Sequence, residues 1–142
     1  MYEKILVSID LNDKKSIKAI IPTVLGLAER FSSEFYFLHV IPDFVIRGLE
    51  EYLPGNWRKD QEKKTEKAFN DIIKKSLPDN IKLNFAIEHG PVYDKVIDYS
   101  DKIRADLIVV SAVGASSKDY MLGTNASKVA RHASVSVLVV RD

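Results

Sequence analysis

The sequence predicts an α/β fold in which one open parallel sheet carries helices on both faces. Five short apolar runs alternate with segments whose apolar residues recur every three or four positions. Parallel strands need helical crossovers, so this alternation favours a parallel sheet over hairpins. The chain of 142 residues and 16.0 kDa has the size of one domain, and we expect residues 1–142 to form it.

The predicted strands are the five apolar runs. They are short and rich in Val and Ile, which is typical of strands buried on both faces. The third run alternates apolar with mostly polar residues, which predicts a half-exposed strand at a sheet edge. The runs span residues 5–9, 35–41, 81–87, 107–110 and 135–140.

Four helices are predicted between these strands. Asn12 or Asp13 can cap the first helix, which extends to Phe31 with Pro22 inside its apolar pattern. Because proline lacks an N–H and crowds the preceding turn, we expect a kink or a late start of the regular helix there. The other helices are expected over about 58–76, over about 92–103 and from about 123 onward.

The segment 42–57 has no clear period and is unusually apolar for a loop. It contains Tyr52 and Trp57, and we expect it to pack on the domain or to cover something, with its role left open. The charge run 59–67 that follows is expected to form a solvated helix face.

Composition excludes several classes of function. The net charge is only +1, whereas proteins that neutralise nucleic-acid phosphates carry a clear basic excess. The absence of cysteine excludes disulfides, thiolate metal sites and cysteine nucleophiles. The apolar runs are far shorter than the roughly 20 residues that cross a bilayer, and residues 1–4 do not resemble a secretory signal. We therefore expect a cytoplasmic protein with neither nucleic acid nor membrane as a partner.

A candidate anion site follows the fourth strand. Ligands of open α/β sheets bind beyond the carboxyl ends of the strands, where the strand order reverses. Eight residues separate Gly114 from Gly123, at the start of the last helix. The backbone N–H groups of Gly123, Thr124 and Asn125 would face a ligand at the positive end of the helix dipole. The alternative is that Gly114 makes a turn and Thr124 caps a helix.

The stretches YMLGTNA at 120–126 and VARHA at 129–133 are similar to the F/G-like branch of the universal stress protein family, and segments along the whole chain resemble that family. Only residues 42–57 match loosely. The other matching segments are ILVSID at 5–10, LHVI at 38–41, GT at 123–124 and SVSVLVVR at 134–141.

The resemblance implies a five-stranded, Rossmann-like sheet in the order 3-2-1-4-5. It also implies ATP or ADP bound between strands one and four, and a homodimer paired through the last strand, which would otherwise be an adhesive edge. The ATP-binding pattern of the family is Gly-x2-Gly-x9-Gly-Ser/Thr, and it falls on Ser111, Gly114 and Gly123-Thr124. Ser111 replaces the first glycine and the spacer has eight residues instead of nine, although the F/G-like branch has a similar shorter loop.

The same resemblance implies roles for individual residues. Val40 would offer its backbone to adenine, and Asp10 would accept from ribose hydroxyls or hold a magnesium ion, although Asp10 could equally be a turn residue. Gly123, Thr124 and Asn125 would bind the β- and γ-phosphates. The implied nucleotide contacts are Ser8, Ile9, Asp10, Val40, Val110, Ser111, Ala112, Gly114, Gly123, Thr124 and Asn125.

The predicted function is an ATP- or ADP-binding regulator or sensor of the stress response. No catalytic residue is assigned, because no general base, arginine finger or paired acidic metal site accompanies the phosphate loop, and hydrolysis would be slow at most. His39, His89 and His132 lack metal-ligand spacing, and His39 is expected to point away from the face of Val40. Two alternatives stay open: a slow magnesium-dependent ATPase using Asp10, and a nucleotide-free dimerisation or interaction module, which Ser111 would favour.

Overall fold

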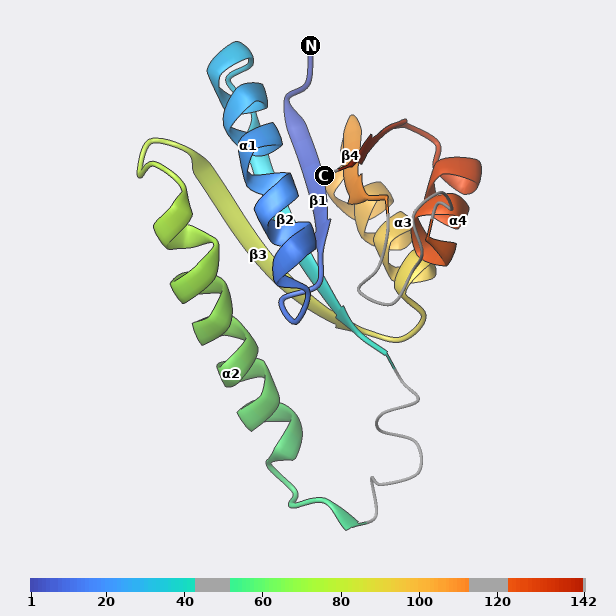
Figure 1. Cartoon of the computed structure of the whole chain (residues 1–142). Coiled ribbons are helices and arrows are strands. Elements are labelled where there is room, and N and C mark those ends of the chain that lie inside the picture. The colour runs from blue at the N-terminus through green and yellow to red at the C-terminus, as the bar shows by residue number, and fades with distance from the viewer. Residues whose placement is uncertain (43–51, 113–122, 142) are drawn as a thin grey trace.

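The computed structural model describes residues 1–42, 52–112 and 123–141. Its sheet consists of β1 (Lys4–Ile9), β2 (Glu34–Ile41), β3 (Lys82–His89), β4 (Leu107–Ser111) and β5 (Ser136–Val140). All neighbouring strands are parallel, and their order is β3-β2-β1-β4-β5 (Figure 1). The predicted fold class and the strand order implied by the resemblance are therefore confirmed.

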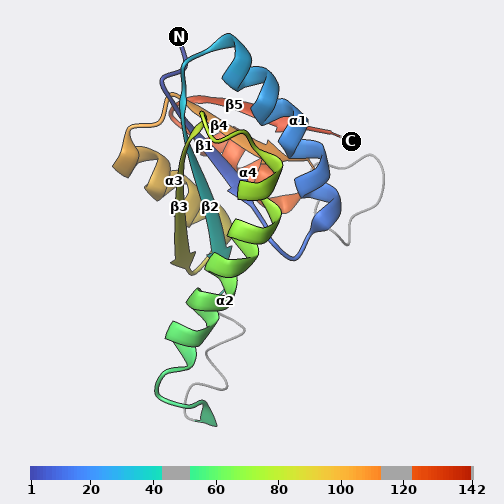
Figure 2. The ribbon, with the colours of Figure 1, turned by 90° about the vertical axis from the view of Figure 1, so that its left-hand side faces the viewer.

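Helices cover both faces of the sheet. They are α1 (Lys14–Arg30), α2 (Trp57–Ile72), α3 (Val92–Ile103) and α4 (Thr124–His132), with a 3₁₀ turn at Lys74–Ser76. Helices α1 and α2 lie on one face, and α3 and α4 lie on the other (Figure 2). Within the three described ranges, no helix is both long enough and apolar enough to cross a membrane.

Strand alternation divides the interior into two cores. On the α1 face, Ile5 and Phe37 are fully buried, and Phe69 of α2 stacks on Phe85 of β3 with ring centroids 4.2 Å apart. On the other face, Leu38 packs with α3 and α4. Each such buried side chain contributes about 1.5–3 kcal/mol by leaving water. The two cores therefore hold both helix layers, and with them the strand ends, in place.

Helix α1 begins earlier than its proline suggested. Asp13 caps it, accepting from the Ser16 N–H at 3.2 Å, and the helix continues through Pro22 to Arg30. The predicted late start is therefore wrong. A proline in a helix interior costs about 3 kcal/mol, whereas burying Ile20 and Val24 against the sheet contributes about 1.5–3 kcal/mol each. Burial of the apolar stripe thus outweighs the lost hydrogen bond.

The segment before α2 differs in part from its prediction. Residues 43–51 lie outside the described part of the chain, but Tyr52 is 81% exposed, so the expected packing of this apolar segment does not hold for Tyr52. The first half of α2 extends beyond the sheet (Figures 1 and 2). Most side chains of the charge run 59–67 are exposed there, as predicted.

Gly90, between β3 and α3, should not tolerate a side chain. Its φ is +136°, and its N–H donates to the Ile41 carbonyl at 3.0 Å. A Cβ at this position would lie 2.8 Å from Cε of Lys95, which can move, but the backbone conformation itself is strained for any L-residue. We expect Gly90→Ala to lower the free energy of unfolding by about 1–3 kcal/mol in urea denaturation.

The matched control for this substitution is Gly26→Ala in α1. Nothing lies within 4 Å of a Cβ built on Gly26, and alanine is the better helix former by about 1 kcal/mol. Gly26→Ala should therefore leave stability unchanged or raise it. Equal effects of the two substitutions would contradict the special conformation of Gly90.

Candidate functional site

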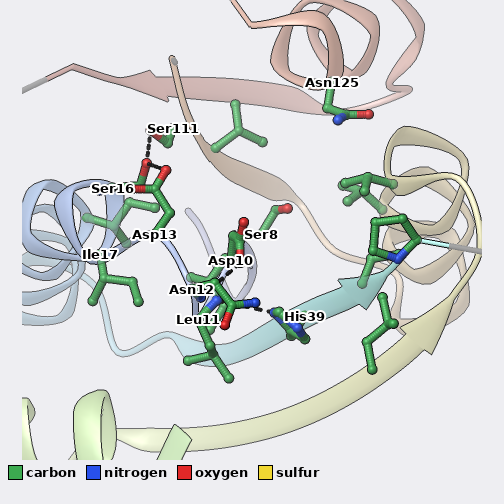
Figure 3. A pocket seen from close by; sticks show the side chains of 18 of the residues that line it. Ser8, Asp10, Leu11, Asn12, Asp13, Ser16, Ile17, His39, Ser111 and Asn125 are labelled. Carbon is green, nitrogen blue, oxygen red and sulfur yellow. Dashed lines mark hydrogen bonds between the residues drawn. The ribbon is translucent and has the colours of Figure 1, made fainter. Parts of the chain in front are cut away.

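An open cavity of about 830 Å³ lies at the carboxyl ends of β1, β2 and β4. Residues after β1, at the start of α4 and on one side of α2 line it, and Figure 3 shows several of them from close by. Volumes in this range are typical of sites for small molecules and cofactors. The strand order reverses between β1 and β4, so the cavity lies where ligands bind in this class of sheet.

Most of the residues predicted for the site meet at this cavity. Ala112 does not line it: this residue is 1% exposed and its N–H donates to the Val140 carbonyl at 2.9 Å, so it joins β4 to β5. Gly114 lies outside the described residues. The predicted residues that line the cavity are Ser8, Ile9, Asp10, Val40, Val110, Ser111, Gly123, Thr124 and Asn125.

The N-terminus of α4 faces the cavity with fewer free donors than expected. The N–H of Gly123 donates to the Ala112 carbonyl at 2.6 Å, so the prediction that this group faces a ligand is wrong. The first intrahelical bond runs from the Ser127 N–H to the Gly123 carbonyl at 2.8 Å. The N–H groups of Thr124 and Asn125 precede that bond and remain at the positive end of the helix dipole.

Asp10 is both a turn residue and a cavity residue. Its Oδ1 accepts from the Asn12 N–H at 2.9 Å, and its carbonyl accepts from the Asp13 N–H at 3.0 Å. The side chain is nevertheless exposed to the cavity, and its second oxygen has no hydrogen bond from the described residues. One acceptor is therefore available to a ligand. Within the described ranges there is no group of three or more His, Cys, Asp or Glu residues that could hold a metal ion.

A chain of hydroxyl groups links β4 to the start of α1. The Ser111 hydroxyl donates to Oγ of Ser16 at 3.0 Å, and the Ser16 hydroxyl donates to Oδ2 of Asp13 at 2.6 Å (Figure 3). Asp13 is only 7% exposed, so these bonds satisfy a buried carboxylate. All three residues line the cavity. Asp13 was expected only as a helix cap.

His39 is a cavity residue that the sequence prediction did not assign to the site. It is 6% exposed, and its Nδ1 accepts from the buried Leu11 N–H at 3.2 Å (Figure 3). Because side chains alternate along β2, it lies on the face of Phe35 and Phe37, whereas Val40 lies on the other face, as expected. The sequence did contain a signal for this role, since His39 is a polar residue at the carboxyl end of an otherwise apolar strand face.

One side of α2 forms a further wall that was not predicted. Gln61, Lys64 and Thr65 line the cavity, so the charge run is not wholly a solvated face. Among the lining residues that the structure describes, Lys64 is the only lysine or arginine, whereas Asp10 and Asp13 are acidic. The described lining is therefore not a strongly basic pocket.

Comparison with known proteins identifies the family. The model of the universal stress protein family matches residues 1–141. The chain belongs to the universal stress protein family. The resemblance predicted from its sequence motifs is thus confirmed.

Relatives in this family cover the chain almost completely. Universal stress protein G of Salmonella typhimurium is 26% identical, with 99% of this chain and all of the relative covered. Universal stress protein MJ0531 of Methanocaldococcus jannaschii is also 26% identical, with 99% of this chain and 83% of the relative covered. The matches therefore extend over the whole sheet rather than one motif.

Solved structures share the fold. The structure of protein MJ0577 has a TM-score of 0.77 at 26% identity and covers all of this chain and 97% of that one. A universal stress protein in complex with cAMP has a TM-score of 0.65 at 22% identity, over 99% and 97% of the two chains. One from Archaeoglobus fulgidus in complex with dAMP has a TM-score of 0.66 at 17% identity, over 99% and 98%.

Stability should depend on pH through His39. Burial lowers its pKa from the usual 6.5, and His89 acts in the same direction, while the Asp10 carboxylate and the Ile9 backbone oppose it. The unfolded chain therefore takes up a proton near pH 6.5 before the folded protein does. We expect the free energy of unfolding to fall below that pH, by at most about 1.4 kcal/mol per pH unit.

This dependence can be measured by urea denaturation from about pH 7.5 to about pH 5. In His39→Asn, Oδ1 can replace Nδ1 as the acceptor but does not titrate in this range. The part of the slope due to His39 should be absent in that variant. An identical slope in both proteins would show that other groups cause the loss.

Proposed function

We infer that the protein binds an adenine nucleotide in the cavity and acts as a nucleotide-dependent regulator of the stress response. The observation that carries this proposal is the convergence of the carboxyl ends of β1, β2 and β4 with the N-terminus of α4 on one cavity of about 830 Å³. The cAMP and dAMP complexes of proteins with the same fold support the choice of an adenine nucleotide.

The chemistry of the walls suits the parts of such a ligand. Ile9 and Val110 offer apolar surface, with Val40 providing backbone groups for the base. The free oxygen of Asp10 can accept from ribose hydroxyls. The N–H groups of Thr124 and Asn125 suit a phosphate, because a helix N-terminus stabilises an anion.

A triphosphate needs more positive charge than the described walls supply. Lys64 shares the described lining with two carboxylates, those of Asp10 and Asp13. A magnesium ion bound with ATP would be held by Asp10, since both oxygens of Asp13 accept hydrogen bonds from Ser16. Such an ion would neutralise phosphate charge. We therefore propose ATP or ADP as magnesium complexes, with hydrolysis slow at most because no arginine lies among the described lining residues.

The nucleotide site is tested by adding charge at the N-terminus of α4. Thr124 is exposed at the first position of the helix, where a carboxylate stabilises the helix dipole. Thr124→Asp should therefore leave the melting temperature unchanged or raise it, while repulsion of phosphate weakens nucleotide affinity at least about tenfold in calorimetry. The assay uses AMP, ADP and ATP with and without magnesium.

The matched control is Ala130→Asp, which places the same charge on an exposed position of α4 outside the cavity lining. It should lower stability, because an acid near the helix C-terminus is unfavourable, and leave affinity unchanged. Mass spectrometry of the freshly purified, denatured protein adds an independent readout. A protein that carries no nucleotide and binds none of the three would refute the proposed function and favour an interaction module.

We further propose that the protein forms a homodimer through β5. This strand is an edge of the sheet, and its Leu138 is 36% exposed, whereas Val137 packs against the core on the α3 face. An unpaired edge strand with an exposed apolar side chain favours association. Leu138 is therefore a better position for a test than Val137, whose replacement would also disturb packing.

Leu138→Lys should shift sedimentation from a dimer toward the 16.0 kDa monomer. The control is Tyr52→Lys, at a more exposed position far from β5 in the sequence, which should leave the dimer unchanged. A wild-type monomer at micromolar concentration would contradict this proposal without affecting the nucleotide site.

A further inference from the structure

The connection between β1 and α1 forms the floor of the cavity. Asp10, Leu11, Asn12 and Asp13 all line it, and so does Ser16 in the first turn of α1. Two hydrogen bonds within the connection, both accepted by Asp10, define its turn. A four-residue turn of this kind needs further contacts to hold one conformation, since each ordered residue loses backbone entropy.

The first such contact comes from β2, the neighbour of β1 on one side. Nδ1 of His39 accepts from the Leu11 N–H at 3.2 Å. Leu11 is 7% exposed, so without this acceptor its N–H would be buried and unpaired. Because Nδ1 accepts, the proton of the neutral ring is on Nε2.

The second contact comes from β4, the neighbour of β1 on the other side. The Ser111 hydroxyl donates to Ser16, and Ser16 donates to the carboxylate of Asp13. This chain joins the end of β4 to the cap of α1. The two contacts therefore approach the same connection from opposite sides, in line with the order β2-β1-β4.

We propose that His39 and Ser111 are positioning residues that hold the β1–α1 connection in its ligand-binding conformation from the two flanking strands. This rests on the proposed nucleotide site. Both side chains act at the carboxyl edge on groups that line the cavity, rather than on the helix packing below. A connection held in this way does not need to be ordered by the ligand, so preorganisation raises affinity.

The test compares removal of each hydrogen bond with its restoration. His39→Leu keeps an apolar volume but removes the acceptor, whereas His39→Asn restores an acceptor at the Nδ1 position. Ser111→Ala removes the hydroxyl, and Ser111→Thr keeps it. We expect His39→Leu and Ser111→Ala each to weaken AMP binding about tenfold, and the Asn and Thr variants to remain within about threefold of the wild type.

Amide hydrogen exchange measured by NMR gives a readout that does not depend on the nucleotide. The N–H of Leu11 should exchange faster in His39→Leu, and that of Ser16 in Ser111→Ala, with protection recovered in the two conservative variants. Ser134→Ala is the control: it removes a hydroxyl that bonds Asp101 at 3.3 Å, outside the cavity lining, and should change neither affinity nor these rates.

Equal affinity loss in His39→Asn and His39→Leu, together with unchanged exchange at Leu11, would overturn the positioning role of His39. Equal affinity loss in Ser111→Thr and Ser111→Ala, together with unchanged exchange at Ser16, would overturn the positioning role of Ser111. If the wild type binds no AMP, ADP or ATP, the proposed function fails and the exchange rates decide this inference alone. Faster exchange of the Leu11 and Ser16 N–H groups in His39→Leu and Ser111→Ala, with protection recovered in the Asn and Thr variants, would show that both strands hold the connection. Unchanged exchange would refute the inference.

Discussion

The central position of β1 determines where the site lies. The chain crosses from β1 to β2 and β3 on one side of the sheet, and later adds β4 and β5 on the other side. The strand order therefore reverses between β1 and β4, which is where ligands of open parallel sheets bind, beyond the carboxyl ends of the strands. The cavity lies at this reversal point. Its floor is the β1–α1 connection, whose place is set by the two cores that fix the sheet and α1.

Two sets of polar groups in the cavity differ in their hydrogen bonding. Those of Leu11, Asp13 and Ser16 are hydrogen-bonded to protein groups, which satisfies them at buried or half-buried positions. One oxygen of Asp10 and the backbone donors at the start of α4 have no such hydrogen bond from the described residues and are available to a ligand. The available groups are thus an acceptor on one wall and donors with a favourable dipole on another. That pairing suits a molecule that has both hydroxyl donors and an anionic group, as a nucleotide does.

Local patterns were sufficient to predict the strands and the start of α4, whereas most strand-end residues of the cavity were implied by the family resemblance. The apolar runs, the edge position of β3 and the start of α4 follow from periodicity and helix-start signals within a few residues. The strand order came from the family resemblance. What failed depends on contacts distant in the sequence: the Gly123 N–H is bound by Ala112, and His39 meets Leu11 across 28 positions. Such hydrogen bonds cannot be predicted from a local sequence pattern.

The wall formed by α2 could not be predicted from local sequence patterns either. Its residues also differ in kind from those of the cavity floor. Lys64 reaches the cavity only because α2 extends beyond the sheet, which its charge run does not indicate. Floor residues such as Asp13 cap α1 and also shape the cavity, so a change there alters stability and binding together. Lys64 and Thr124 are exposed and contribute no side chain to either core. Ligand preference can therefore change at these walls without loss of the fold, whereas the floor must be kept for both.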